Sequence, residues 1–308
     1  MLGIIDVAGY FPTKTVENSN YREKFGVDEE FLSKKIGVLK RTVKAVDESV
    51  TDMCVSAFVE LQNRNNIDVS MIDCCVVVTQ NPDYNIPHTS AIVHDRLGLA
   101  EGCACFDISL GCSGYVYALS IVTAFMSANG LKLGLIFTAD PYSKIVDEDD
   151  KNTALIFGDA ASVTLIGEAP KLVPKSFDFG SRGKGYKNLI NEEKLFMNGR
   201  AVYTFAATTV PGSVAKALDK ASVRKDDIDR WYFHQGSKYI VDTLSARLDI
   251  DEEKVVFDMY EYGNTVSSSI PLLLEKDLRT EKLSSGNNLL LSGFGVGLSW
   301  ASAVYKVL

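Results

Sequence analysis

Cys112 lies in the segment DISLGCSGYV (107–116), where a strand-like run gives way to a helix-like one. A cysteine in the first turn of a helix faces unpaired N–H groups and the positive end of the helix dipole, which favour a thiolate. The same N–H groups can bind the oxyanion that forms when a thiolate attacks a carbonyl. A packed, inert thiol remains the alternative, because free cysteines are among the most buried residues.

His234 is the histidine best placed to assist a cysteine nucleophile. It ends the aromatic strand WYFHQ (231–235), where the carboxyl end of a strand delivers side chains to the active-site edge of an open α/β sheet. His88 and His94 lie in or beside the short helix HTSAIVHDRLG and are interpreted as packing or surface residues. A structural histidine at a strand end is the alternative for His234.

Asn264 and a glycine-rich loop complete the set of candidates. Asn264 follows the predicted strand KVVFDMY (254–260), and an Asn after Gly263 is otherwise a common turn residue. The loop SGFGVGLSW (292–300) joins two predicted strands and can bring backbone N–H groups against a ligand, or it is simply a hairpin. Each signal is weak alone, but all four follow core strands, and that combination is specific.

Alternating strands and helices position these residues and indicate an α/β fold. The run DCCVVVTQ (73–80) is typical of a strand buried on both faces. The other predicted strands are the N-terminal run MLGIIDVAGYFP, CACFDIS (103–109), LGLIFTAD (133–140), WYFHQ, KVVFDMY, NLLLSGFG and SWASAVYKVL. The predicted helices span 49–65, 88–98, 112–128, 206–221, 238–249 and 268–280.

A weak internal repeat indicates that the chain is a duplication. MIDCCVVVTQ (71–80) and DIDRWYFHQ (227–235) both follow a helix and a short polar loop, share an Ile-Asp pair and end at Gln. The segment GEAPKLVPK concentrates Gly, Pro and Lys and separates the two copies. We therefore expect an N-terminal half at 1–168 carrying the cysteine and a C-terminal half at 169–308 carrying the histidine and asparagine.

Composition narrows the classes of function. The formal charge of −8, without a basic block, argues against a nucleic-acid-binding protein. No apolar run is long enough to span a membrane, and the N-terminus lacks the features of a signal peptide. The six cysteines show no CxxC spacing, which argues against a zinc site and a disulfide framework and favours a reduced, cytoplasmic protein.

The sequence resembles the β-ketoacyl-acyl-carrier-protein synthase III family of thiolase-fold condensing enzymes, nearly end to end. The matching stretches are KKIGVLKR (34–41), PHTSAIVHDRLGL (87–99), DISLGCSGYVYAL (107–119), FGDAAS (157–162), HQGS (234–237), YGNTVSSSIP (262–271) and GFGVGLSW (293–300). The resemblance implies a thiolase-like fold, with two duplicated α/β halves packed as a five-layer α-β-α-β-α sandwich.

The resemblance further implies a two-step condensation without metal or redox cofactor. Cys112 would take an acyl group from acyl-CoA, and a malonyl thioester would then lose CO2 and attack the acyl-cysteine. His234 and Asn264 would donate hydrogen bonds to the thioester oxygen during decarboxylation. The N–H groups of Cys112 and of the loop near Gly295 and Val296 would form the oxyanion hole, with Phe294 packed beside the histidine.

The resemblance also implies contacts to coenzyme A and to a carrier protein. Phe31, Arg41 and Lys151 are expected to contact coenzyme A, with Phe31 standing where the family often has Trp and Lys151 where it has Arg. The expected carrier-protein patch consists of Lys238, Arg247 and Lys254, set among five acidic residues.

Further departures from the family pattern concern the substrate. The usual His-Gln-Ala-Asn reads His-Gln-Gly-Ser at 234–237, and Val296 replaces a glycine. These changes leave the chemistry intact and are compatible with a specialised relative that acts outside primary fatty acid synthesis.

Several alternatives remain open from the sequence. A polyketide-type synthase, or an acyltransferase that passes the acyl group to an alcohol or amine, is the nearest, although Asn264 favours condensation. A hydroxymethylglutaryl-CoA-type synthase would need a glutamate in the loop that reads QNPD (80–83), and a hydrolase elbow would need glycine in place of Leu110. A non-catalytic partner subunit would usually lack one of the three site residues.

The resemblance also implies a homodimer, with the segment after residue 81 near the interface.

Overall fold

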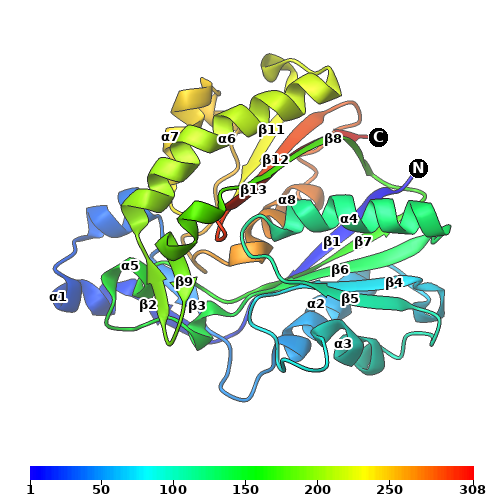
Figure 1. Cartoon of the computed structure of the whole chain (residues 1–308), viewed down its shortest axis with the longest axis horizontal. Coiled ribbons are helices and arrows are strands. Elements are labelled where there is room, and N and C mark those ends of the chain that lie inside the picture. Colours follow the sequence, from blue (N-terminus) through cyan, green and yellow to red (C-terminus); the bar gives the residue numbers. More distant parts are fainter.

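The computed structural model describes residues 1–308, and its main strands form two half-sheets of the same design (Figure 1). The first has the order β5-β4-β6-β7-β1 and the second the order β11-β12-β13-β8. Because Ile4 of β1 pairs with Leu172 of β8, they join into one nine-stranded sheet. The strands are β1 (Gly3–Tyr10), β4 (Cys74–Val78), β5 (Ala104–Ile108), β6 (Leu133–Ala139), β7 (Ala161–Gly167), β8 (Leu172–Ser181), β11 (Arg230–Phe233), β12 (Asn288–Gly295) and β13 (Ser299–Val307).

Strand directions repeat between the halves. The pairs β4–β6 and β11–β12 are parallel, and they occupy equivalent places in the two half-sheets. The next two pairs in each half are antiparallel. In the first half they are β6–β7 and β7–β1, and in the second half β12–β13 and β13–β8. This repeated order supports the duplication predicted from the sequence.

Six helices cover the half-sheets and give five layers, as predicted (Figure 1). The outer helices of the first half are α2 (Val50–Arg64) and α3 (Thr89–Leu97), and those of the second are α6 (Gly199–Ala221) and α7 (Lys238–Leu248). Between the two half-sheets lie α4 (Gly114–Asn129) and α8 (Ser269–Arg279). None of the helices combines the length and the apolar character that crossing a membrane would require.

Alternation along β4 explains its continuous apolar sequence. Cys74, Val76 and Val78 face the core shared with the central helices, whereas Cys75 and Val77 face the core under α2. A strand with helices on both faces must be apolar on both, because neither face meets water.

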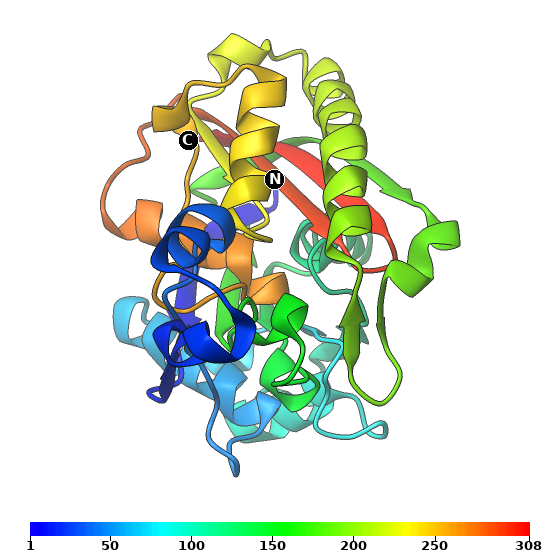
Figure 2. The same ribbon diagram turned by 90° about the vertical axis from the view of Figure 1, so that its left-hand side faces the viewer.

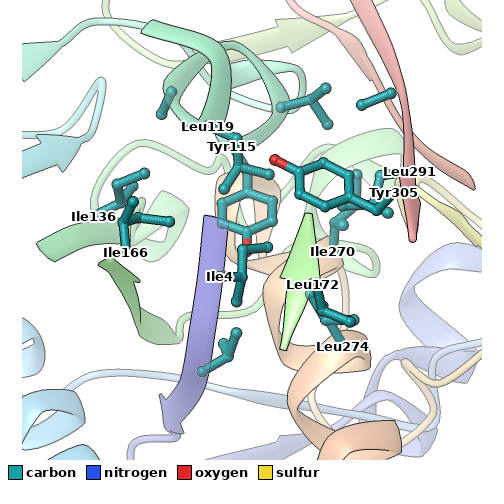
Figure 3. Packing of buried hydrophobic residues seen from close by; sticks show 14 of the residues in the cluster. Ile4, Tyr115, Leu119, Ile136, Ile166, Leu172, Ile270, Leu274, Leu291 and Tyr305 are labelled. Atoms are coloured by element: carbon teal, nitrogen blue, oxygen red, sulfur yellow. The ribbon is translucent and has the colours of Figure 1, made fainter. Parts of the chain in front are cut away.

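The central core packs side chains of both halves around α4 and α8 (Figure 3). Tyr115 of α4 and Tyr305 of β13 are completely buried there, next to Ile270 of α8. The Tyr115 hydroxyl lies 3.1 Å from Thr164 Oγ1, which satisfies a polar group that burial would otherwise leave unpaired. Truncating a buried aromatic side chain of this kind costs about 3–5 kcal/mol.

Local signals fix several helix ends. Helix α2 begins with a capping box between Ser49 and Asp52, and α4 ends at Gly130, which adopts φ 68° as the predicted Asn-Gly stop requires. Helix α6 begins at Gly199, seven residues before the predicted start at 206, because the Asn198 side chain accepts a hydrogen bond from Ala201 N and caps it.

The predicted strand at 254–260 is wrong. Only one bridge, between Val255 and Trp231, extends the second half-sheet here. Beyond it the chain turns to the N-terminal half, where Tyr260 O accepts hydrogen bonds from Leu39 N and Lys40 N. Only Val255 and Val256 therefore pair with the neighbouring strand β11, and the rest of the segment forms no strand, although the position matches β5 of the first half.

Several short elements lie outside the nine-stranded sheet and its six covering helices. They are β2 (Thr15–Glu17), α1 (Arg22–Phe25), a π-helical turn (Phe31–Ile36), β3 (Lys40–Thr42), α5 (Lys151–Ala154) and the hairpin of β9 (Leu189–Asn191) and β10 (Leu195–Met197). Figure 2 shows the N-terminal excursion in dark blue beside α7 in yellow, and the π-helical turn contacts α7. β7 ends at Gly167 and β8 begins at Leu172, and the division into halves at 168/169 remains a prediction.

Candidate active site

Cys112, His234 and Asn264 line one cavity of about 330 Å³. His234 and Asn264 follow Cys112 by more than a hundred residues in the sequence. Each of the three lies at the end of an element in a different part of the fold. Cys112 precedes α4, His234 follows β11, and Asn264 precedes the turn that leads into α8. Cys112 and Asn264 therefore occupy corresponding places, before the central helix of each half.

Strand β12 approaches the backbone of Cys112 closely. A Cβ atom added to Gly295 would lie 2.7 Å from both Cβ and Sγ of Cys112, and one added to Gly293 would lie 2.6 Å from the Cys112 carbonyl oxygen. Ser113 is held to β13 through Ser299, with 2.7 Å between the two hydroxyl oxygens. Glycine is required at these two positions because backbone and thiol occupy the space of a side chain.

The Cys112 thiol differs from the prediction in its protonation. Helix α4 begins at Gly114, so Cys112 precedes the helix rather than occupying its first turn. Burial raises the pKa of Cys112 to about 12, although the backbone N–H groups of Val296 and of Cys112 itself face the sulfur and act in the opposite direction. The resting side chain is therefore a thiol, and the two N–H groups mark where an oxyanion would be bound.

His234 is buried and neutral. Its backbone N donates to Ser292 O at 2.9 Å, which fixes it to the neighbouring strand β12, and its Nδ1 lies 2.8 Å from Ser269 Oγ. The ring meets Phe294 edge to face, with 5.6 Å between ring centroids and 88° between planes. Burial lowers the pKa of His234 to about 3, so the imidazole is uncharged at neutral pH.

Asn264 has one end of its side chain occupied. The Val266 N–H donates to Asn264 Oδ1 at 2.9 Å, and Val266 adopts φ 54°, an uncommon backbone conformation for a β-branched residue. Asn264 N also donates to Ile156 O at 2.8 Å, which anchors the residue to the N-terminal half. Because the amide oxygen is occupied, the NH2 group is the part of Asn264 available to a ligand in the cavity.

The residues predicted for the oxyanion hole and pocket separate into two groups. Phe294 and Gly295 line the cavity with Cys112. Val296 lines a second cavity, while its N–H faces the Cys112 sulfur. The Ser299 hydroxyl donates to Val296 O at 2.8 Å and holds this turn in place.

The residues predicted to contact coenzyme A are not all accessible from the cavity. Phe31 lines it, and the Lys151 ammonium lies 4.7 Å from the centre of the Phe31 ring. Arg41 lies outside the lining, is 2% exposed, and donates through Nε to Asn18 Oδ1 at 3.0 Å. Its guanidinium also packs over Tyr21. The buried Arg41 side chain therefore stabilises the N-terminal segment that contains Asn18 and Tyr21.

The predicted carrier-protein patch is partly neutralised. Lys238 forms an ion pair with Asp242 at 2.8 Å, and Lys254 donates to the backbone carbonyl of Ile228 at 2.9 Å. Only Arg247 of the three is exposed without a salt bridge. A positive surface formed by these residues alone is correspondingly small.

Sequence reasoning missed several residues of the cavity and its entrance. Lys35 of the π-helical turn, Arg200 and Tyr203 of α6, and Tyr239 of α7 line the cavity. The rings of Tyr203 and Tyr239 stack with 5.1 Å between centroids. No local signal identifies them, because only the packing of α6, α7 and the N-terminal excursion brings them together.

Comparisons with known proteins agree over the whole chain. Residues 106–183 match the family model described as 3-oxoacyl-(acyl-carrier-protein) synthase III, and residues 218–307 match the model of its C-terminal part. The β-ketoacyl-(acyl-carrier-protein) synthase III of Geobacillus kaustophilus is 34% identical over 305 residues, which cover 99% of this chain and 98% of that protein. The corresponding enzyme of Deinococcus deserti is 31% identical and covers 99% of this chain and 91% of its own length.

Solved structures lead to the same family. The β-ketoacyl-(acyl-carrier-protein) synthase III of Thermus thermophilus superposes with a TM-score of 0.93 at 31% identity, covering 99% of this chain and 98% of that one. A priming β-ketosynthase of a polyketide pathway superposes with a TM-score of 0.92 at 26% identity, covering 100% and 96%. The chain has the thiolase fold of these condensing enzymes and belongs to the 3-oxoacyl-(acyl-carrier-protein) synthase III family.

Proposed function

We propose that this chain joins an acyl group to a malonyl-derived unit by decarboxylative condensation and releases a 3-oxoacyl thioester. The observation that carries the proposal is the shared cavity of Cys112, His234 and Asn264, which places a thiol beside two neutral hydrogen-bonding groups. A nucleophile and two donors are the groups that acyl transfer and enolate stabilisation require.

In the first step Cys112 accepts the acyl group. Its sulfur attacks the carbonyl carbon of acyl-CoA, the carbon–sulfur bond to coenzyme A breaks, and coenzyme A leaves as a thiol with the cysteine's proton. The N–H groups of Cys112 and Val296 are the proposed oxyanion donors, because both already face the sulfur. The product is an acyl-Cys112 thioester.

In the second step a malonyl thioester loses CO2, and the electron pair of the broken carbon–carbon bond forms an enolate. His234 and Asn264 are proposed to donate hydrogen bonds to the enolate oxygen. The free NH2 group of Asn264 supports this role, as does the neutral state of His234, whose ring retains one N–H. The enolate carbon attacks the acyl-Cys112 carbonyl, and the released thiolate takes up a proton.

The substrates are proposed to enter past Phe31 and the aromatic pair of Tyr203 and Tyr239, which line the cavity with Lys35 and Arg200. Two cationic side chains near this opening favour the phosphates of coenzyme A and of a phosphopantetheine arm. The relatives are named for an acyl carrier protein, and we extend that partner to this chain as the malonyl donor. Metal and redox cofactors have no part in the proposed steps.

Three variants test the division of roles. Cys112→Ser is expected to abolish acylation by radiolabelled acyl-CoA, while Cys105→Ser, a second thiol outside the cavity, should leave it unchanged. His234→Ala and Asn264→Ala should keep acylation and lose release of CO2 from malonyl thioesters. Malonyl-CoA and malonyl-carrier protein are assayed side by side, and the product is identified by mass spectrometry.

Equal loss of acylation in Asn264→Ala and Cys112→Ser would contradict the proposal. Formation of an ester or amide instead of a 3-oxoacyl product would replace it with simple acyl transfer. An intact cysteine that no acyl-CoA modifies would favour a non-catalytic subunit.

We also propose that the protein is located in the cytoplasm, in keeping with its free cysteines.

We further propose that the protein forms a homodimer through the β5 edge of the sheet. The outer edge of β5 carries unpaired backbone groups, and Tyr84 and Ile86 in the loop before α3 are 62% and 88% exposed. An open strand edge beside exposed apolar side chains is a common subunit contact. Sedimentation should give a dimer at micromolar concentration, and Ile86→Asp should shift it towards monomer; a monomeric parent chain would contradict the proposal.

A further inference from the structure

Asp140 is a completely buried carboxylate that the proposed steps do not use. It directly follows β6, and its two short hydrogen bonds come from neutral groups. The Gln80 N–H donates to Oδ1 at 2.7 Å, and the Ser267 hydroxyl donates to Oδ2 at 2.6 Å. Burial raises the pKa of Asp140 to about 6, so the group is still ionised at neutral pH. A buried charge held only by neutral donors costs folding stability, and such costs are concentrated where a residue serves a function.

Ser267 connects this carboxylate to the turn that carries Asn264. The Ser267 side chain is buried, and its distance of 2.6 Å from Asp140 is typical of a hydroxyl that donates to an ionised carboxylate. Ser267 directly follows Val266, whose N–H donates to Asn264 Oδ1 at 2.9 Å. The bond to Asp140 therefore fixes the backbone that orients the Asn264 amide.

The turn needs such an anchor because its backbone conformation is unfavourable. Val266 adopts φ 54°, a left-handed conformation that a β-branched residue keeps only where the surrounding contacts enforce it. Ser267 and Ser268 both hold the turn against the end of β6, Ser267 through Asp140 and Ser268 through Thr138. The bond from Ser267 is the one nearer to Val266 in the chain, and it is the one made to a charged group.

The second bond of Asp140 reaches the segment just before Cys112. A Cβ atom added to Gly111 would lie 2.5 Å from Gln80 Oε1 and 3.3 Å from Val266 Cγ1. Gln80 and the turn of Val266 are both held by Asp140, and both lie against the backbone that leads into the nucleophile. One carboxylate thus sets the position of the Asn264 turn relative to Cys112.

We infer that Asp140 is a positioning residue for decarboxylation, which acts through Ser267 to hold the Asn264 amide in place for the malonyl thioester. The inference rests on the proposed role of Asn264 in binding the enolate oxygen. Acylation of Cys112 does not use the Asn264 amide. Loss of the bond between Asp140 and Ser267 should therefore slow the second step more than the first.

The test compares the two steps in single-turnover assays with acetyl-CoA, malonyl-CoA and malonyl-carrier protein. Ser267→Ala and Asp140→Ala should each lower CO2 release roughly tenfold to a hundredfold, as expected for a lost bond to a charged group, and acylation by less than about threefold. The double variant should be no slower than Asp140→Ala, because the two residues act through one bond. Ser267→Thr keeps the hydroxyl and should restore most of the CO2 release.

Ser213 and Asp178 provide a matched control. The Ser213 hydroxyl donates to Asp178 Oδ2 at 3.0 Å, both residues are buried, and neither lines the Cys112 cavity. Ser213→Ala should therefore keep the parent ratio of CO2 release to acylation.

The inference is overturned if Ser267→Ala keeps the parent ratio, or if both steps fall equally in that variant. Ser267→Ala removes only one oxygen atom and decides the test by itself if Asp140→Ala does not fold. A parent chain that forms no acyl-Cys112, or that releases no CO2, would instead reject the proposed function on which the inference rests.

Discussion

The Nδ1 atom of His234 lies 2.8 Å from the hydroxyl oxygen of Ser269, on the side of the ring opposite Nε2. The same hydroxyl lies 3.1 Å from the carbonyl oxygen of Val266. A hydroxyl has one proton, so it can donate either to that carbonyl or to the ring. When it donates to Nδ1, the Nε2 atom keeps its hydrogen and can act as the donor that decarboxylation requires.

Ser269→Ala should therefore lower condensation more than acylation. Loss of a hydrogen bond to a buried ring typically costs about 1–3 kcal/mol, which corresponds to a fall in the condensation rate of roughly tenfold to a hundredfold. Single-turnover assays of acyl transfer and of CO2 release separate the two steps. Ser269→Thr should restore much of the loss, and Ser245→Ala, another buried serine, serves as control. A proportional fall in both steps would contradict this role.

Gly295→Ala should impair the reactivity of Cys112 because a methyl group there would lie 2.7 Å from the sulfur. We expect acylation to fall by at least about tenfold, since either the thiol or strand β12 must move. Gly199→Ala is the matched control, because Gly199 lines the same cavity but has open space around its added methyl. Acylation rates are measured by mass spectrometry of quenched reactions. Equal rates in both variants would show that the close approach of β12 to Cys112 does not affect its reactivity.

The reactivity of Cys112 towards iodoacetamide should rise with pH. Its pKa of about 12 leaves only a small thiolate fraction at neutral pH, so alkylation should accelerate about tenfold for each pH unit between roughly 7 and 10. Peptide mapping follows Cys112 specifically, and bound acyl-CoA should protect it. A plateau near neutral pH would mean that the two N–H groups facing the sulfur outweigh burial.

His234 should make the folded protein less stable in acid. Its pKa falls from 6.5 to about 3 on folding, so it favours the folded state above pH 6.5 and this contribution is lost as pH falls towards 3. Within that window the free energy of unfolding should decrease by up to about 1.4 kcal/mol per pH unit from this residue. Urea unfolding at pH 7 and pH 5 should show a smaller difference for His234→Gln than for the parent chain.

Much of the fold follows from local sequence. The apolar run of β4 predicts burial on both faces, and the Asn-Gly pair at 129–130 predicts the end of α4, because both signals act through residues adjacent in the chain. The strand predicted at 254–260 failed for a related reason. Val256 and Met259 are buried, but only the start of the segment pairs with β11, and Tyr260 O instead accepts hydrogen bonds from Leu39 N and Lys40 N, more than two hundred residues earlier in the chain. No local pattern reports such a distant partner.

The candidate site divides in the same way. The types and spacing of Cys112, His234 and Asn264 suffice to predict that they meet, because each follows or precedes an element whose place in an α/β fold is known. Arg41 and Lys254 look like free cations in the sequence. In the structure Arg41 donates a hydrogen bond to Asn18, and Lys254 donates to backbone carbonyls. These partners follow from long-range packing, which the sequence pattern does not report.

The sequence by itself determined the family, the duplicated order of strands and the three residues at the centre of the site. Tertiary structure decided that the Cys112 thiol is buried and protonated and that the oxygen of Asn264 is already occupied. Periodicity and motif spacing are written along the chain. Burial, pKa and the shape of a cavity arise only when distant segments exclude water from one another.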